Sequence, residues 1–180
     1  MPITPGSLER VLAVANSYHE PEAREVYEGP RWLPAHDHLE DGDSALDFLG
    51  RSGFKLVKPP QPRHLAGMRQ IRAAARALVT NRKEYERRTQ QLLAGARYRL
   101  DSTGRLRPVA QGWDGVIEGL LPGLVELRSC ADRLKLCENP QCRWLFIDRS
   151  KNRSRHWCEA ATCGNRQRVR KFRRRQEAAG

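Results

Sequence analysis

Apolar residues along the first 130 positions recur at intervals of three and four, the spacing of one face of an α-helix. This pattern predicts helices over residues 4–19, 44–49, 63–80, 82–95 and 113–127. The clearest is 63–80, whose core face is expected to consist of Leu65, Met68, Ile71, Ala75, Leu78 and Val79. Thr4 or Ser7 is a candidate cap for the first helix. Pro122 lies inside the last one, so a kink or a break is expected there.

Alternating patterns predict only short strands. Residues 98–109 alternate around a glycine-containing turn, the pattern of a β-hairpin. Residues 133–136 are predicted as a short strand leading into the first cysteine pair, and residues 144–148 alternate as another strand. This second strand is expected to turn through the polar residues 149–154 and pair with residues 155–158 as a second hairpin.

The segment 20–58 is rich in proline, glycine and acidic residues, so it is predicted as loop around the short helix 44–49. Pro-Pro-Gln-Pro at 59–62 is a stiff linker that ends any preceding helix. Two histidines and three acids before it suggest a second metal site: His36, His38, Asp37, Asp41 and Asp43. No helical or strand spacing orients these side chains, so a solvated turn is the preferred interpretation.

Four of the five cysteines form two pairs of identical spacing. The first pair is Cys137-Glu-Asn-Pro-Gln-Cys142 and the second is Cys158-Glu-Ala-Ala-Thr-Cys163, with fifteen residues between the pairs. Two short loops that each deliver two sulfurs supply the four soft ligands of a tetrahedral Zn²⁺ site. Cys137, Cys142, Cys158 and Cys163 are therefore predicted to bind zinc. The alternatives are two disulfides, or buried thiols that pack as small hydrophobic groups.

The odd number of cysteines disfavours disulfides, since it leaves Cys130 over, and this residue is predicted as a core thiol. The chain opens with Met1-Pro-Ile-Thr-Pro rather than with a charged start and an apolar signal segment, so a cytoplasmic protein with reduced thiols is expected. No apolar run approaches the roughly 18 residues of a membrane span. His156, a rival zinc ligand, is expected to be exposed or to lie beside the site.

The formal net charge of +12 is concentrated near the C-terminus. Residues 137–180 carry 12 basic and 4 acidic side chains, whereas residues 1–136 carry 21 and 17. Seven of the ten residues at 166–175 are Arg or Lys, more than the helix dipole alone would favour. A nucleic acid is therefore the expected partner, with a solvated basic tail as the alternative. DNA is preferred over RNA because few aromatic residues are present to stack on unpaired bases.

A helix over residues 164–177 would be about 20 Å long and would fit a DNA major groove. The candidate contacts lie on this helix and on the polar turn before it. They are Arg149, Lys151, Arg153, Arg155, Asn165, Arg166, Arg168, Arg170, Lys171, Arg173, Arg174 and Arg175. Asn165 is a candidate either for reading adenine or for capping the helix, and capping is the preferred interpretation.

These residues resemble the CGNR zinc-finger family. The resemblance covers about residues 137–175 and rests on both cysteine pairs, on the segment from Trp144 to Trp157 and on the run Cys163-Gly-Asn-Arg166. It implies the four cysteines as metal ligands and DNA binding as the activity. In that family the finger follows a helical N-terminal module, the ABATE domain, described as a stress-induced transcription regulator. Leu12-Ala-Val-Ala-Asn16-Ser17 resembles the early apolar-Asn-Thr segment of that module, with Ser in place of Thr.

The expected fold class is α+β. A mainly helical ABATE-like domain with one β-hairpin is expected over residues 1–130, and a small treble-clef-like zinc finger with a basic C-terminal helix over residues 131–180. The expected function is zinc-dependent DNA binding by a non-enzymatic transcriptional regulator, whose helical part senses a small molecule or holds a homodimer. The alternatives are an RNA-binding or ribosome-associated zinc module, a zinc-stapled protein-interaction scaffold, and an enzyme that uses His36, His38 and Asp41.

Overall fold

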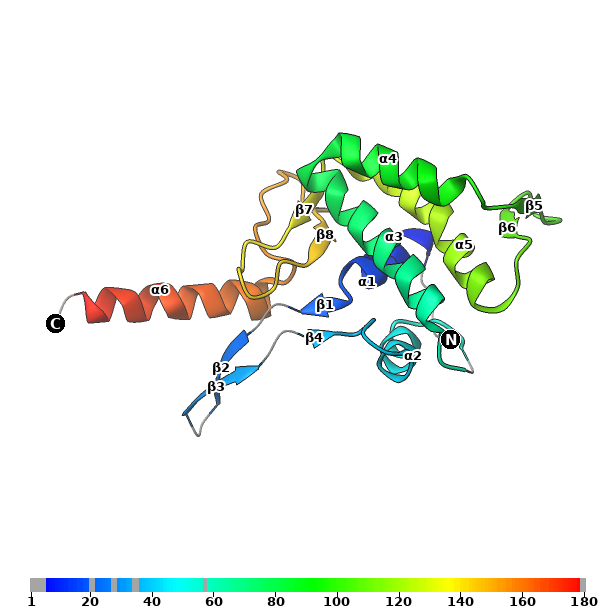
Figure 1. The fold of residues 1–180 in the computed structure, drawn as a ribbon. Helices are drawn as coiled ribbons and strands as arrows, with labels where there is room; N and C mark the ends of the chain where they lie inside the picture. The colour runs from blue at the N-terminus through cyan, green and yellow to red at the C-terminus, as the bar shows by residue number, and fades with distance from the viewer. Residues whose placement is uncertain (1–5, 20–21, 27–28, 34–35, 57, 179–180) are drawn as a thin grey trace. The chain divides into compact units, whose positions relative to one another are not determined.

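The chain forms a mixed fold of helices and small sheets (Figure 1). The computed structural model describes most of the 180 residues, namely 6–19, 22–26, 29–33, 36–56 and 58–178. Within these ranges there are six α-helices and four two-stranded sheets. The chain divides into two compact units. The helical unit comprises residues 1–18 and 37–132, and the cysteine unit comprises residues 19–36 and 133–180.

The helical unit packs around α3, which contacts α1, α2, α4 and α5. Its elements are α1 (Ser7–Ala15), α2 (Gly42–Arg51), α3 (Pro62–Thr80), α4 (Arg82–Leu93), β5 (Tyr98–Leu100), β6 (Leu106–Pro108), α5 (Gly112–Glu126) and the 3₁₀ turn η1 (Leu127–Cys130). The apolar faces of three helices form its core, with Val11, Val14, Met68, Ile71, Leu120, Leu121 and Leu124 almost completely buried. Burial of these apolar faces is the main stabilising contribution to this unit.

Local sequence signals set the helix ends. The Asp41 carboxylate accepts hydrogen bonds from the backbone N–H groups of Asp43 and Ser44, both at 2.9 Å, and so caps α2. Asn81 caps α4 in the same way, because its Oδ1 accepts from Glu84 N at 3.2 Å. α3 begins at Pro62, a position where the missing N–H of proline costs no hydrogen bond.

The predicted helices and the 98–109 hairpin are confirmed, although several details were wrong. Val79 was expected in the core of α3 but is 38% exposed. Ser7 does not cap α1, since its hydroxyl donates to Glu126 Oε2 at 2.6 Å. Cys130 is only partly buried rather than a core thiol. Thr4, the other proposed cap, lies outside the described residues.

Pro122 was expected to kink or break the helix; no break occurs, and α5 runs through this residue. Pro122 has no N–H to donate to the carbonyl of Glu118, four residues earlier. The hydroxyl of Tyr98 donates to that carbonyl at 2.7 Å. The hairpin that carries Tyr98 therefore satisfies the acceptor that the proline leaves open.

The cysteine unit contains β2 (Glu22–Val26), β3 (Gly29–Leu33), β7 (Leu134–Leu136), β8 (Leu145–Ile147), the π-helical turn η2 (Ala160–Gly164) and α6 (Asn165–Glu177). β2 and β3 pair antiparallel although their segment was predicted as loop, and the two-residue strands β1 (Tyr18–His19) and β4 (His36–Asp37) also pair. The second predicted hairpin was wrong in its pairing. β8 pairs with β7, and residues 155–158 form no strand.

No helix in the described part of the chain is both long enough and apolar enough to cross a membrane.

Candidate metal centre

The first cysteine pair lies in the turn of the β7–β8 hairpin. Leu134 is opposite Ile147 and Leu136 is opposite Leu145, so Cys137 directly follows the last paired residue of β7. The backbone N–H of Cys137 donates to the carbonyl of Trp144 at 2.8 Å. The hairpin thus continues into the turn, and this turn points two sulfurs toward one place.

Asn139 closes that turn from within. Its carbonyl accepts the N–H groups of Cys142 at 2.9 Å and of Arg143 at 3.1 Å. Arg143 has φ 52°, a left-handed conformation that reverses the chain after the second sulfur. Asn139 is followed by Pro140, and an Asn-Pro dipeptide favours a tight turn of this kind.

The second pair is delivered by the start of the C-terminal helix. Cys158 precedes η2 and Cys163 lies within it, directly before α6. The turn has a π-helical hydrogen bond, from Gly164 N to Glu159 O at 3.2 Å. The helix continues without interruption from η2 into α6, so the orientation of α6 is coupled to the position of Cys163.

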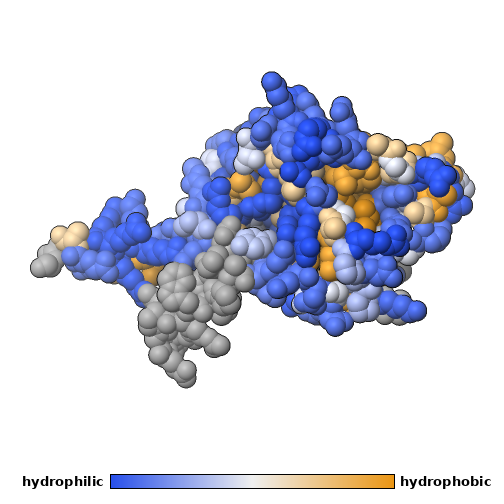
Figure 2. Space-filling model, viewed as in Figure 1, coloured by the Kyte–Doolittle hydropathy of each residue, from blue (hydrophilic) through white to orange (hydrophobic). Residues whose placement is uncertain are grey.

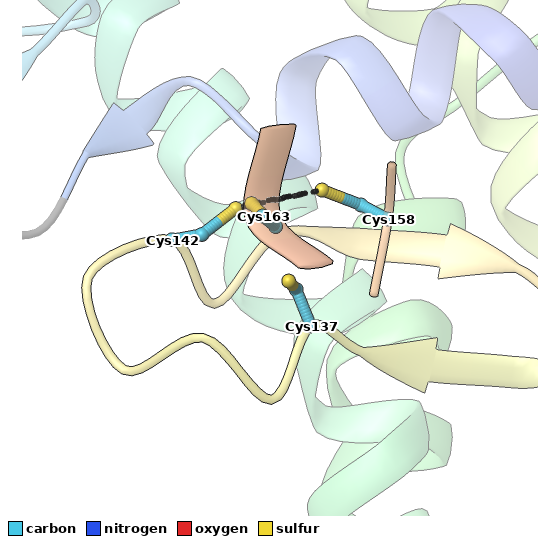
Figure 3. Close-up of side chains that lie close together, drawn as sticks. All are labelled: Cys137, Cys142, Cys158 and Cys163. Atoms are coloured by element: carbon cyan, nitrogen blue, oxygen red, sulfur yellow. Dashed lines mark hydrogen bonds between the residues drawn. The ribbon is translucent and has the colours of Figure 1, made fainter. Parts of the chain in front are cut away.

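The four sulfurs come together as a tetrahedral zinc site requires (Figure 3). They all lie within 4.8 Å of one another. The Sγ atoms of Cys142 and Cys158 are 3.6 Å apart, and those of Cys158 and Cys163 are 3.7 Å apart. With Zn–S bonds of about 2.3 Å, neighbouring sulfurs of a tetrahedral site lie roughly 3.8 Å apart. Both the donor set and the spacing therefore fit Zn²⁺.

The cysteines are part of the small apolar cluster of this unit. Cys137, Cys163 and Phe146 are buried, and Trp157 packs partly buried against them. Such a cluster is too small to hold the fold by burial alone. A bound metal ion in modules of this size contributes on the order of 10 kcal/mol of folding free energy. Zn²⁺ held by the four sulfurs would therefore be the main structural support of the cysteine unit.

The pKa values of Cys137 and Cys142 are raised, whereas that of Cys158 is lowered. Burial raises the pKa of Cys137 to about 11, against hydrogen bonds from the backbone N–H groups of Cys158 and Asn139. The thiol of Cys142 donates to Cys158, which raises the pKa of Cys142 and lowers that of Cys158 to about 6. Protons therefore compete with a metal ion for these sulfurs, so zinc affinity should fall as the pH is lowered.

The side chain of Asn139 connects the first cysteine pair to α6. Asn139 is completely buried, and its Nδ2 donates to Cys163 Sγ at 3.5 Å. Its Oδ1 accepts from Gln167 Nε2 at 3.0 Å and from Arg170 Nη1 at 3.5 Å. One buried amide thus contacts a sulfur ligand and two residues of the basic helix.

Asp148 organises the loop between the two cysteine pairs. It is completely buried, and its carboxylate accepts from Lys135 Nζ at 2.8 Å, Ser150 N at 2.9 Å and Arg155 N at 2.9 Å. Burial alone would raise the pKa of Asp148, but the hydrogen bonds from Lys135, Ser150 and Arg155 N hold it below its usual range. Asp148 therefore remains a carboxylate at neutral pH.

Asp148→Asn is expected to destabilise the loop at neutral pH, because an amide NH₂ group would face donors that now point at a carboxylate. Zinc should be lost to a chromophoric chelator roughly tenfold faster than from the wild type, a change of the size that follows loss of a charged hydrogen-bond partner. The contribution of Asp148 should be present above its ordinary pKa of 3.8 and be lost as the pH falls through the lower folded-state value. Asp47→Asn, at an exposed ion pair with Arg51, is the control. Equal rates of zinc loss from both variants would contradict the role given to Asp148.

Gly164 lies close to the ring of Trp157. A Cβ at this position would lie 3.0 Å from Cδ1 and 3.5 Å from Nε1 of the indole ring. Gly164→Ala is expected to destabilise the metal-loaded protein by about 1 to 3 kcal/mol, since the ring would have to move. Thermal unfolding in excess zinc measures this change. Gly50→Ala is the matched control, because a Cβ there meets no atom within 4 Å and should stabilise α2 slightly.

The twelve predicted nucleic-acid contacts lie in two places. Four are on the loop after β8, and all four are exposed: Arg149, Lys151, Arg153 and Arg155. Eight are on α6, which has no buried residue. Arg155 and Arg170 are among those whose side chains have structural contacts within the unit. Arg155 lies over the Phe146 ring at 5.3 Å and donates to the carbonyl of Cys158, and Arg170 contacts Asn139.

Asn165 does not cap the helix as predicted. It has helical dihedral angles, so it lies inside the helix. The N-cap position is taken by the residue before it, Gly164, which has no side chain that could cap the helix. Because η2 already supplies the preceding turn, α6 has no free first turn for a cap to satisfy. Asn165 is exposed.

His156 is not among the grouped metal ligands. Its side chain is 60% exposed, and its Nδ1 pairs with Glu138 Oε1 at 2.7 Å.

Sequence reasoning missed the roles of Asn139, Asp148 and Lys135. The signal for Asp148 was its position two residues before Ser150, the pattern of an Asx turn. No sequence pattern indicated that Lys135 would reach the same carboxylate.

The histidine and aspartate segment before α2 forms structural contacts instead of a second metal group. Asp37 pairs with Arg72 through both oxygens, at 2.6 and 2.8 Å, and Asp41 caps α2. The ring of His38 stacks on Phe48 with centroids 4.4 Å apart. Among the described residues, only the four cysteines form a group that could hold a metal ion. Arg72 of α3 is largely buried where it pairs with Asp37.

Comparison with known proteins agrees with this geometry in the C-terminal part of the chain. No curated protein matches the sequence. Residues 133–176 match the family model of the CGNR zinc finger, and the four sulfurs that this segment brings together are positioned to bind Zn²⁺.

Proposed function

We propose that the cysteine unit is a zinc-dependent DNA-binding module and that the protein is a transcriptional regulator without catalytic activity of its own. The arrangement we infer for the module is treble-clef-like, with one ligand pair from a hairpin turn and the other from the start of a helix. The helical unit would then be the ABATE-type regulatory part that senses a small molecule or holds a homodimer. The observation that carries the proposal is the exposed basic surface of α6.

α6 is built to be solvent-exposed and cationic. It has thirteen residues and none is buried, and Figure 2 shows it hydrophilic over most of its visible face. Within the described part of the chain, the side chains of Arg168, Lys171, Arg174 and Arg175 make no hydrogen bond or ion pair. A helix of this length spans about 20 Å, and arginine on such a helix suits phosphates and guanine edges.

The metal centre would make this surface dependent on zinc. Cys163 is followed within two residues by α6, and Asn139 contacts both Cys163 and two α6 residues. Without the metal these contacts would no longer fix the direction of the helix. The cations of α6 would remain, but their arrangement would be lost. DNA affinity should then fall, since ordering the helix on binding costs conformational entropy.

The positions of the other cations refine the contact set. Lys151, Arg149 and Arg153 on the loop are suited to neighbouring phosphates, because they are exposed. Arg155 and Arg170 support the module through Cys158 and Asn139, so we assign them mainly structural roles. α6 therefore supplies the main contact surface.

The test is fluorescence anisotropy with duplex DNA and with structured RNA, at matched salt concentrations, using the zinc-loaded protein and the protein treated with a chelator. We expect the duplex to bind more tightly than the RNA, with an affinity that falls steeply with salt and decreases on zinc removal. Preferential RNA binding would favour the ribosome-associated alternative. Binding unaffected by zinc removal would overturn the proposal.

A second candidate is a zinc-stapled surface for an acidic protein partner. The specific observation in its favour is an apolar stripe on α6, where Phe172 is 63% exposed and Val169 is 40% exposed. Such a stripe beside cations would fit an apolar groove with an acidic rim. Nucleic acid that co-purifies with the protein, measured as a high ratio of absorbance at 260 and 280 nm, would argue against this candidate.

A further inference from the structure

A cavity of about 720 Å³ lies in the helical unit, between α1, the segment after α2, the β5–β6 hairpin and α5. Small-molecule sites commonly have volumes of roughly 300 to 1,000 Å³. Its apolar lining includes Phe54, Leu106, Val116 and Leu120. Figure 2 shows hydrophobic side chains exposed at the β5–β6 end of this unit, where Leu106 is 55% exposed. The cavity thus combines an open mouth with an apolar wall.

Three glycines of α5 border this space. Gly112, Gly115 and Gly119 all line the cavity, at a spacing that places them on one side of the helix. A Cβ at Gly119 would meet only Pro108 Cγ, at an ordinary contact distance of 3.7 Å. Packing therefore does not require glycine at this position, although glycine is less favourable than alanine inside a helix. Gly119 thus leaves free volume in the cavity wall that a larger side chain would fill.

The cavity is also lined by cationic side chains that no acidic side chain among the described residues neutralises. The Nε of Arg10 is buried and has no hydrogen-bond partner, and its guanidinium lies over the Phe54 ring at 5.5 Å. Lys55 and Arg99 line the same cavity, and their side chains make no hydrogen bond or ion pair with any described residue. Arg107 is different, because Asp101, the acidic residue of the lining, accepts its Nε at 2.8 Å.

We propose that this cavity binds a small amphipathic organic anion, a carboxylate carried on an apolar body. The carboxylate would pair with Arg10, which leaves a buried N–H unsatisfied at a cost in free energy that an anion would relieve. Lys55 and Arg99 would attract the ligand to the mouth. The apolar body would cover Phe54, Val116 and Leu120. A nucleic-acid backbone would match the charge but would leave this apolar wall uncovered.

The experiment is an amide NMR titration of the full zinc-loaded chain with octanoate, octanol and inorganic phosphate. Octanoate should shift the amide signals of Phe54, Gly115 and Gly119 and saturate. Octanol should bind at least roughly tenfold more weakly, since it has the apolar body without the charge. Phosphate should give no saturable shift at these amides. Equal binding of octanoate and octanol would overturn the proposal, as would the absence of any saturable shift by octanoate.

Two kinds of variant test the cationic side chains and the free volume of the cavity separately. Arg10→Gln should weaken octanoate binding roughly tenfold, and Gly119→Leu should abolish it by filling the cavity. Because Arg10 is partly interior, the exposed pair Lys55→Gln with Arg99→Gln tests the charge without changing the core, and it should weaken binding severalfold. Arg87→Gln on α4 is the control and should bind as the wild type does. Unchanged octanoate affinity in both charge variants would overturn the proposal. The proposal would also fail if duplex DNA shifted the same amide signals and octanoate did not compete with it.

Discussion

Cys158→Ser is expected to abolish stoichiometric zinc binding and to unfold the cysteine unit. Cys158 Sγ lies 3.6 Å from Cys142 Sγ and 3.7 Å from Cys163 Sγ, so its loss removes one corner of the four-sulfur group. Metal binding supplies on the order of 10 kcal/mol of folding free energy in small zinc modules. The apolar cluster around Phe146 and Trp157 is too small to replace it. Zinc per chain, measured by elemental analysis after dialysis, should fall to near zero.

The helical unit should survive this substitution, because its core is formed by α1, α3 and α5 and contains none of the four cysteines. Far-UV circular dichroism should therefore retain most of its helical signal, while the tryptophan fluorescence changes through Trp144 and Trp157. Cys130→Ser is the matched control, since Cys130 lies outside the sulfur group and should keep its zinc. Full zinc retention by Cys158→Ser would refute the four-sulfur site.

Replacing Lys171, Arg174 and Arg175 together by Gln is expected to weaken DNA binding about 100-fold near 0.1 M salt, while the zinc content stays the same. These side chains are exposed and make no described contact with the metal centre. Each phosphate contact contributes about 0.9 to the slope of log affinity against log salt concentration. The slope should thus decrease by about 2.7 if all three contact phosphates. Anisotropy titrations at several salt concentrations measure both quantities.

The control for this variant has the same charge change on another helix. Arg82, Lys83 and Arg87 of α4 are exposed and can be replaced by Gln, which again removes two arginines and one lysine. If binding depends only on the net charge of +12, both triple variants will lose the same affinity. That result would contradict a specific contact by α6. Arg170 is unsuitable for this test because its contact with Asn139 links it to the metal centre.

Sequence patterns predicted the helices well because each is amphipathic over several turns, as in α3 with Leu65, Met68 and Ile71 on one side. They failed where a distant group decides the outcome. Proline 122 carries a strong local signal for a break, but the hydroxyl of Tyr98 from the hairpin satisfies the carbonyl that proline leaves open. Alternation also predicted that residues 144–148 form a strand, yet it could not identify the partner. The partner is β7, which pairs with β8 on the other side of the turn that carries the first cysteine pair.

The four cysteines with their equal spacing determined the donor set and the number of ligands, because structural Zn²⁺ sites take four ligands in tetrahedral geometry. The run of cations at 166–175 likewise determined where the charge of the protein is concentrated. Tertiary structure alone decided which polar groups support the site. Asn139 and Asp148 are completely buried, and each collects hydrogen bonds from residues that are far away in sequence, such as Arg170 and Lys135. Local sequence records which groups can donate or accept, but only the folded chain brings a particular donor within about 3 Å of its acceptor.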